Sequence, residues 1–519
     1  MKRAVASIVL PVLFIASPAR AVPAVHDVIV RLDGAASTDV VERLARAAGG
    51  FRIGARWHII NAFAASMTDE QRALLTSLPH VVRVEPDLIV HATASNARSS
   101  FGVTKAVTDF GVTGDRDGAA RTWTRTDVVA CVVDTGIDTT HVDLDGGQVI
   151  AWRDFVNART TPYDDNGHGT HVSSILAGQG DGSASYKGVA PGTALIGAKV
   201  LDSSGSGASS RIISGVQFCV DQHVRVINLS LGSSVSSDGT DALSAAVNSA
   251  ASAGTVPVVA AGNSGPAERT IGTPAAAASA LTVCSMADTG VNGFFVSTFS
   301  SRGPTADGRV KPDICGPGES IRAAKANSGN GYVTLSGTSM ATPFVAGVVA
   351  LMLDANPAMT PSSVKSAVMQ TAQDWRTAGA DSDTGAGRLQ AYEAIKKAGS
   401  YTGTGPSVPG HWMQSQSLAT SSEDRWKLVV TSATAPIALT LIIPSASASK
   451  DFDLYLAYDS GSGLIYEGSS ETAARQETVG FNPSATGTYY AIVRSYAGSG
   501  SYYLDLSYKG NAPALGSNG

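Results

Sequence analysis

The sequence predicts three folded parts in series: a small α+β unit, a larger α/β domain with a mostly parallel sheet and helices on both faces, and an all-β sandwich. Its 519 residues are enough for about three to four domains. In the middle of the chain, nearly continuous apolar runs alternate with alanine-rich helical patterns, which is typical of strands covered on both faces. After about residue 410 the helical patterns stop, and short alternating runs between Gly-Ser turns indicate the strands of a sandwich.

The composition excludes several classes of protein. Lysine and arginine total 38 and aspartate and glutamate total 43, so the net charge is −5. A nucleic-acid or anionic-membrane binder would need an excess of basic residues, so we expect neither kind of partner. Hydrophobic residues make up 43 % of the chain, which excludes a disordered protein.

The first 21 residues have the pattern of a secretory signal peptide. Lys2 and Arg3 precede an apolar run over 4–15, and Ala19-Arg20-Ala21 forms a small-residue cleavage site. The alternative, a transmembrane anchor, is disfavoured because the run is shorter than a membrane span and Pro11 interrupts it. We therefore expect a secreted, soluble protein.

Secretion into an oxidising compartment permits disulfide bonds. The four cysteines allow three pairings, of which we expect Cys131–Cys219 together with Cys284–Cys315. The alternative is that one or both pairs are buried free thiols.

Residues 22–95 predict the small α+β unit. Strands are expected near 28–32, 57–67 and 81–84, with one helix in each interval. Thr68 as N-cap and Gln71 three residues later form a capping box that opens the second helix. The resulting order, β-α-β-α-β, suits a small α+β domain.

Residues 96–398 predict the α/β domain. Buried strands are indicated by five apolar runs, at 128–133, 194–201, 224–231, 256–261 and 280–285. Helical patterns lie between them, as at 209–223 and 240–253. Residues 399–410 have the composition of a linker, and residues 411–510 predict the separate β-sandwich.

Three segments of the α/β domain carry the residue types of nucleophilic catalysis. Ser339 precedes an apolar helical pattern with Pro343 expected in its first turn, so Ser339 should lie at a helix N-terminus, which favours developing negative charge. His168, in Asn-Gly-His-Gly-Thr-His, supplies the base that a serine nucleophile needs. Asp134 ends a buried strand, where sites form in open α/β sheets, and can fix the tautomer of the histidine.

Each motif alone has a simpler interpretation. Ser339 could cap a turn, Asp134 could cap a helix, and His168 with His171 could lie in a loop or bind a metal. The glutamate of the zinc motif H-E-x-x-H is missing here, which disfavours metal catalysis. The three motifs together are far more specific than any one of them.

Together these segments resemble the subtilisin family of serine endopeptidases, in which the catalytic residues follow the order Asp, His, Ser. Here that order is Asp134, His168, Ser339. The segment Val-Ala-Ala-Gly-Asn that ends at Asn263 is similar to the family's oxyanion segment. The resemblance implies that the Asn263 side chain and the Ser339 backbone N–H stabilise the oxyanion. It also implies hydrolysis of proteins and peptides, with no cofactor required for the chemistry.

The resemblance further implies a cleft in which an extended substrate adds as a strand between two segments of the chain. Gly272 matches the floor of the family's main specificity pocket, which implies room for a large apolar P1 side chain. The alternative for the Gly-Ser segments is ordinary loops. The implied substrate-binding residues are Gly205, Ser206, Gly207, Ser230, Leu231, Gly232, Ala260, Gly262 and Gly272.

The flanking parts resemble the additions that such proteases carry. Residues 22–95 resemble an inhibitory propeptide, which implies a zymogen whose own propeptide is an intramolecular inhibitor. Its tail, at about 88–98, would lie in the cleft and be cut by the enzyme itself. Residues 411–510 resemble the β-domain appended to secreted bacterial peptidases. Since all four catalytic candidates precede the linker, we expect this β-domain to be dispensable for the chemistry, and we expect a monomer.

Calcium is the metal that the resemblance implies. Asp143 matches a calcium-ligand position of the family, and calcium favours such oxygen ligands. The loop that would supply the remaining ligands does not match well, because residues 180–185 have few side-chain oxygens there. Asp164 and Asp165 are a second candidate, with solvated carboxylates as the alternative.

Two other classes of protein remain as alternatives. A binding protein with an inactive α/β domain would be expected to lack one of the four catalytic candidates, yet all four are present. An esterase or lipase would favour the motif G-x-S-x-G with a different order of catalytic residues, and the last position of that motif is Ala341 here.

Overall fold

The computed structural model describes residues 26–33, 37–57, 62–86, 97–289, 293–444 and 450–516. The chain divides into two compact units, residues 1–90 and residues 91–519. The predicted signal peptide lies outside the described residues. So does the predicted cleavage tail at about 88–98, except for Ala97 and Arg98, which begin a short helix.

The first unit is an antiparallel sheet with two helices, in strand order β2-β3-β1-β4. Its elements are β1 (His26–Leu32), α1 (Thr38–Ala47), β2 (Arg52–Trp57), β3 (Ala62–Met67), α2 (Asp69–Thr76) and β4 (Val81–Pro86). The expected α+β class is confirmed, although the strand predicted over 57–67 is two strands. The capping box is present, because Thr68 Oγ1 accepts from Gln71 N–H and Gln71 Oε1 accepts from Thr68 N–H.

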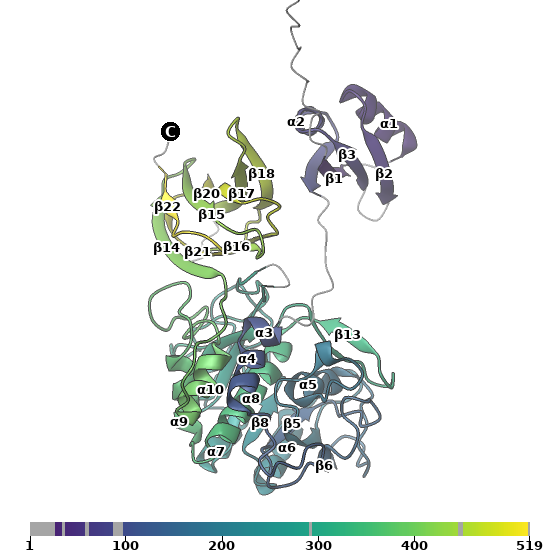
Figure 1. Cartoon of the computed structure of the whole chain (residues 1–519), viewed down its shortest axis with the longest axis vertical. Coiled ribbons are helices and arrows are strands. Elements are labelled where there is room, and N and C mark those ends of the chain that lie inside the picture. The colour runs from purple at the N-terminus through teal and green to yellow at the C-terminus, as the bar shows by residue number, and fades with distance from the viewer. Residues whose placement is uncertain are drawn as a thin grey trace, which may run out of the picture. The chain divides into compact units, whose positions relative to one another are not determined.

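A seven-stranded parallel sheet forms the centre of the second unit, in strand order β11-β10-β9-β8-β5-β7-β6 (Figure 1). The strands are β5 (Val129–Asp134), β6 (Val149–Asp154), β7 (Ala194–Lys199), β8 (Val226–Leu229), β9 (Val256–Ala260), β10 (Leu281–Met286) and β11 (Ile314–Pro317). All five predicted strands are confirmed. Every residue of β5, β7, β8, β9 and β10 is buried, which explains why their sequences are almost continuously apolar.

Helices cover both faces of this sheet. Successive residues of β5 point alternately into two hydrophobic clusters, Ala130 and Val132 into one, Cys131 and Val133 into the other. The first cluster is completed by α4 (Val103–Phe110), α5 (His168–Ala177), α8 (Thr338–Ala355), α9 (Pro361–Gln370) and α10 (Ala391–Gly399). The second is completed by α6 (Ser209–Asp221) and α7 (Ala242–Ser252). The predicted α/β class is therefore confirmed.

The apolar helix α8 carries Ser339 as its second residue. It is long and apolar enough to cross a membrane, but 83 % of its apolar window is buried inside the protein, as in a core helix. Pro343 lies beyond the first turn, so the predicted position of this proline is wrong. A proline has no N–H to donate to the carbonyl four residues earlier, which is that of Ser339. That carbonyl instead accepts a hydrogen bond from Ser230 Oγ at 2.9 Å.

The C-terminal region is the predicted β-sandwich, made of two antiparallel sheets in strand orders β14-β21-β16-β19 and β18-β17-β20-β15-β22. Its strands are β14 (Gly410–Leu418), β15 (Glu423–Val430), β16 (Ile437–Ile442), β17 (Asp451–Asp459), β18 (Leu464–Ser470), β19 (Gln476–Phe481), β20 (Gly487–Ala497), β21 (Gly500–Tyr508) and β22 (Ala514–Leu515). Inward-facing residues of both sheets form one hydrophobic core.

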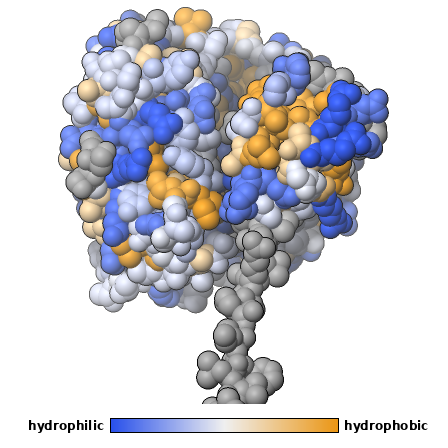
Figure 2. Space-filling model, turned by 90° about the horizontal axis from the view of Figure 1, so that it is seen from above, coloured by the Kyte–Doolittle hydropathy of each residue, from blue (hydrophilic) through white to orange (hydrophobic). Residues whose placement is uncertain are grey.

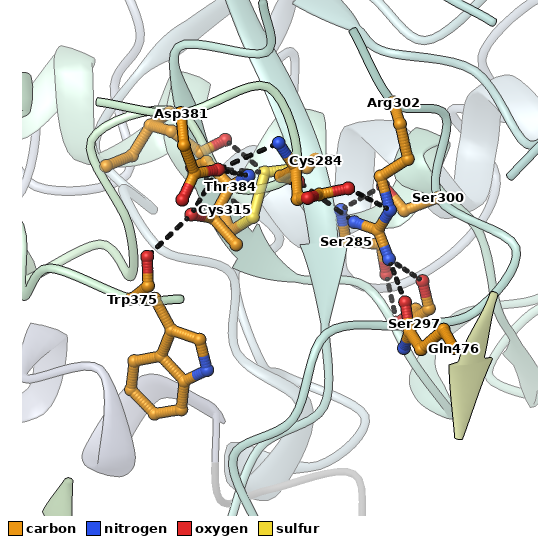
Figure 3. The surroundings of a disulfide bond; sticks show 12 residues. Cys284, Ser285, Ser297, Ser300, Arg302, Cys315, Trp375, Asp381, Thr384 and Gln476 are labelled. Atoms are coloured by element: carbon orange, nitrogen blue, oxygen red, sulfur yellow. Dashed lines mark hydrogen bonds and ion pairs between the residues drawn. A yellow bond between two sulfur atoms is a disulfide. The ribbon is translucent and has the colours of Figure 1, made fainter. Parts of the chain in front are cut away.

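Both predicted disulfides are present. Cys131–Cys219 joins β5 to α6, and Cys284–Cys315 joins the neighbouring strands β10 and β11 (Figure 3). Because no cysteine is free, the alternative of buried thiols is excluded.

The connection between the α/β domain and the sandwich is packed rather than free. Tyr401 stacks on Phe110 with 4.6 Å between ring centroids. The ring of His411, in β14, stacks on buried Trp375, with 3.4 Å between the ring centroids.

The hairpin of β12 (Ile321–Ala324) and β13 (Tyr332–Leu335) forms a two-stranded sheet that is separate from the large sheet. On the face seen in Figure 2, hydrophobic patches are bordered by hydrophilic residues.

Candidate active site

Asp134 and His168 form the first part of the site. Asp134 is the last residue of β5 and His168 the first of α5, so the carboxyl edge of the sheet brings them together. His168 Nδ1 lies 2.7 Å from Asp134 Oδ1, which also accepts the Thr135 backbone N–H. The Asp134 side chain is fully buried, whereas that of His168 is 26 % exposed. The carboxylate can therefore hold Nδ1 protonated and leave Nε2 as a base.

The charge on Asp134 also governs the titration of His168. Burial by itself would lower the pKa of His168. The Asp134 charge, the hydrogen bond to it and the more distant charge of Asp164 outweigh burial, so the pKa of His168 is raised above its ordinary value.

The loop before α5 is held in place by Asp164, a role that the sequence did not reveal. Five donors converge on its buried carboxylate: the hydroxyls of Thr135 and Thr170 and the backbone N–H groups of Asn166, Gly167 and Thr170. Asp164 is thus neither solvated nor free for a cation, and both expectations for it are wrong. Asp165 accepts from buried Lys199 Nζ at 2.6 Å.

Ser339 and His168 line the same cleft. Its hydroxyl donates to the Ser230 carbonyl oxygen at 3.1 Å, while Ser230 Oγ donates to the Ser339 carbonyl. Asn228 Nδ2 in turn donates to Ser230 Oγ at 2.9 Å. Ser230, predicted only as a substrate-binding residue, therefore fixes both the main chain and the side chain of Ser339. For a proton to pass from Ser339 to His168, the Ser339 hydroxyl would have to turn from the Ser230 carbonyl oxygen to His168 Nε2.

Asn263 follows β9 by three residues and faces the start of α8. Its Oδ1 accepts two hydrogen bonds from Thr338, from the backbone N–H at 2.9 Å and from the hydroxyl at 3.0 Å. With Oδ1 engaged in this way, the donor Nδ2 of the amide remains available to the cleft. Thr338, which the motif search did not single out, thus fixes the orientation of the Asn263 amide.

The cleft has a volume of about 750 Å³. Its lining includes His168, Asn263 and Ser339 together with eight of the nine predicted substrate-binding residues, namely Gly205, Ser206, Gly207, Ser230, Leu231, Gly232, Ala260 and Gly262. Buried Asp134 lies behind His168 and does not line it. Residues that the sequence did not single out also contribute, among them Leu201, Ile212, Leu243, Ser264 and Thr273.

Gly272 is not among the residues that line the cleft. A Cβ at this position would lie 2.0 Å from the Ser233 carbonyl oxygen, and Gly272 forms a β-bridge with Ser236. The glycine is needed because two backbones approach closely there, not because a pocket needs room. Its neighbour Thr273 lines the cleft instead, where its hydroxyl donates to Asp241 Oδ1 at 2.6 Å.

Asp143 does not fit the calcium ligand that the resemblance implies. Its Oδ1 accepts the Gly182 backbone N–H at 3.0 Å and its Oδ2 accepts the Tyr332 hydroxyl at 2.9 Å. Burial and the Asp143 carboxylate raise the pKa of Tyr332, so the phenol stays a donor. A cation needs oxygen acceptors around it, whereas the groups on this carboxylate are donors.

The comparisons with known proteins agree with the fold. The subtilase family model matches residues 125–387, which is half of the chain, and the chain therefore belongs to the subtilase family. The peptidase inhibitor I9 model matches residues 31–93, and the bacterial pre-peptidase C-terminal domain model matches residues 422–495. The protein is thus a hydrolase of the serine endopeptidase class, and its I9 region implies that it is made as a zymogen.

Several known proteins are similar to the chain. Serine protease AprX of Bacillus subtilis (strain 168) is 37 % identical over 374 residues, which are 66 % of this chain and 81 % of AprX. Subtilisin E of the same strain is 34 % identical over 326 residues, 62 % of this chain and 78 % of subtilisin E. Thermitase of Thermoactinomyces vulgaris is 38 % identical over 265 residues, 51 % of this chain and 87 % of thermitase.

The role of Tyr332 can be tested by its replacement with phenylalanine. Tyr332→Phe should lower the free energy of unfolding by about 1–3 kcal/mol, because buried Asp143 Oδ2 loses its donor. Denaturant unfolding with and without added calcium chloride measures this. Calcium should not restore the lost stability, and full recovery with calcium would show that Asp143 is a cation ligand instead.

The pH dependence of peptide cleavage tests the pairing of Asp134 with His168. His168 can accept a proton only when neutral, and its pKa is raised, so kcat/KM should be half-maximal above about pH 6.5 and fall about tenfold per unit below that point. In Asp134→Asn the midpoint should move down, because the carboxylate that favours the cation is gone, and kcat should fall by roughly 10³-fold or more. An unchanged midpoint in folded Asp134→Asn protein would contradict the pairing.

Proposed function

We propose that the chain is a secreted, self-processing endopeptidase in which Ser339 is the nucleophile, His168 the general base and Asp134 the carboxylate that orients it. The observation that carries this proposal is the 2.7 Å contact between Asp134 and His168 at the edge of the cleft that Ser339 lines. The order of the three residues along the chain matches that of the family.

The proposed reaction follows from these contacts. The Ser339 hydroxyl turns from the Ser230 carbonyl to His168 Nε2, gives up its proton and attacks the peptide carbonyl carbon. The resulting imidazolium is stabilised by Asp134 and then protonates the leaving amine. Water attacks the acyl-enzyme in the same way and releases Ser339.

Asn263 is the proposed donor to the oxyanion, together with the Ser339 backbone N–H. Support comes from the two Thr338 hydrogen bonds, which fix the amide with Nδ2 free. Ser339 also lies in the first turn of α8, where backbone N–H groups lack helical partners. Removal of one such donor costs about 10²- to 10³-fold in kcat in enzymes of this kind.

We also propose a preference for large apolar P1 residues, but the support for it is no longer the one that the sequence suggested. Gly272 no longer supports it. The support is now the volume of the cleft and the apolar side chains that line it, including Leu231, Leu243 and Ala260. The chemistry uses no metal, and we propose that the enzyme acts as a monomer on extracellular proteins.

Maturation provides the test of this function. Ser339→Ala, expressed in a host without other proteases, should lose only the signal peptide and keep residues 22–95. The first substrate of the active enzyme is its own propeptide tail, and this variant lacks the nucleophile that would cut it. Ser336→Ala is a matched control in the same motif and should mature normally, since the hydrogen bond found for Ser336 Oγ among the described residues is that from the Ser320 backbone N–H. Mass spectrometry of the secreted proteins decides the outcome. Normal removal of the propeptide from Ser339→Ala would refute the assignment of the nucleophile.

A further inference from the structure

Charged side chains are buried between the α/β domain and the β-sandwich. Asp383 of the α/β domain is 1 % exposed and Arg475 of the sandwich is 3 % exposed. They form a bidentate pair, Nη1 to Oδ1 at 2.6 Å and Nη2 to Oδ2 at 3.1 Å. Burial would raise the pKa of Asp383, but the bonds from Arg475 and the charges of Arg302 and Arg376 hold it below its usual value. Buried ions need such close pairing, because it offsets the loss of hydration.

Arg475 also reaches the segment that follows Asn263. Its Nη1 donates to the Pro266 carbonyl oxygen at 3.3 Å, and its Nη2 lies 3.1 Å from Glu268 Oε1. Its Nε donates to the Ile443 carbonyl oxygen at 2.9 Å, which anchors the guanidinium to its own domain. Pro266 is three residues from Asn263, so one side chain of the sandwich touches the chain just beyond the cleft.

A second chain segment ties the same region to the sandwich. Ser301 N–H donates to the Gly262 carbonyl at 2.9 Å, and Gly265 N–H donates to the Phe299 carbonyl at 2.9 Å, so these bonds flank Asn263. The next residue, fully buried Arg302, donates to the Asp383 carbonyl at 2.9 Å and to Gln476 Oε1 of β19 at 2.5 Å (Figure 3). Two chain segments beside Asn263 are therefore hydrogen-bonded to the sandwich. The segment with Pro266 is bonded to Arg475, and the segment with Arg302 is bonded to Gln476.

We propose that Arg475 is a positioning residue for the oxyanion donor Asn263, so that the sandwich is a working part of the catalytic unit rather than a dispensable addition. This inference rests on the proposed role of Asn263. Arg475 acts through the Asn263–Glu268 segment and does not touch the substrate. Arginine suits the task because its planar fork can bind a carboxylate with two bonds and still donate to carbonyls on either side.

The test compares Arg475→Met with Arg494→Met in the full-length, matured enzyme. Arg494 is the matched control, because the partners found for it among the described residues, Glu423 and Tyr455, both belong to the sandwich. Asp383 keeps Arg302 and Arg376 in Arg475→Met, which limits the cost to folding. Arg475→Lys serves as a conservative variant that retains the charge. Each protein is assayed for kcat and KM on a small chromogenic peptide, at temperatures below its measured melting point.

We expect kcat to fall roughly tenfold in Arg475→Met with KM nearly unchanged, because a misplaced donor weakens transition-state binding alone. Arg475→Lys should recover part of the loss, and Arg494→Met should match the wild type. Wild-type kcat in folded Arg475→Met would overturn the inference.

A double-mutant cycle separates positioning from general destabilisation. In the Asn263→Ala background, Arg475→Met should have no further effect on kcat, because the donor it positions is absent. An equal loss in both backgrounds would overturn the inference while leaving the proposed function intact. Wild-type activity of Asn263→Ala itself would instead remove the oxyanion role on which the inference rests.

Discussion

The hydrogen bond between the buried Asp134 carboxylate and His168 Nδ1 is the interaction on which the rest of the site depends. A buried carboxylate is costly unless donors surround it. Oδ1 of Asp134 has two donors, but buried Oδ2 has no hydrogen-bond partner among the described residues. Such a group costs about 1–3 kcal/mol, which the hydrophobic clusters on both faces of the sheet must offset. In the proposed mechanism, this unpaired oxygen belongs to the carboxylate whose charge stabilises the His168 imidazolium.

In the remaining parts of the site, side chains form hydrogen bonds with backbone groups that have no partner within a helix or strand. Pro343 leaves the Ser339 carbonyl without its helical donor, and Ser230 supplies one. Thr338 fixes the amide of Asn263, and Asp164 collects the N–H groups of the loop before α5. Each element that carries a functional residue is therefore tied to another element by polar groups, which limits the motion that would disturb the geometry.

Much of the fold could be predicted, because burial on both faces leaves a continuous apolar run in each central strand. Short motifs indicated Asp134, His168 and Ser339 as candidates, and the resemblance to the subtilisin family added Asn263. What could not be predicted depends on contacts between distant segments. Nothing in the local pattern around Gly272 shows that Ser233 approaches it, and nothing near Asp143 shows that Tyr332, far along the chain, occupies its carboxylate.

The contact between the β-sandwich and the α/β domain also could not be predicted from the sequence. Its strands and its boundary with the α/β domain were visible in the composition, and the glycine-rich connection indicated a loosely attached module. The pairing of Arg475 with Asp383 carries no signature in either segment, because it joins residues 92 positions apart through their side chains alone. An arginine or aspartate on a strand or loop is ordinarily solvated, so only the folded structure shows that these two are buried together.

The central claim is that the Ser339 hydroxyl is the reacting nucleophile. The most direct measurement is peptide mapping by mass spectrometry after the mature enzyme has been inactivated with an organophosphorus reagent that modifies activated serines. The account predicts one adduct per molecule, on Ser339, and none in a His168→Ala variant, whose serine has no base. Complete inactivation with the adduct on another serine, or an enzyme that still cleaves peptides with Ser339 modified, would contradict it.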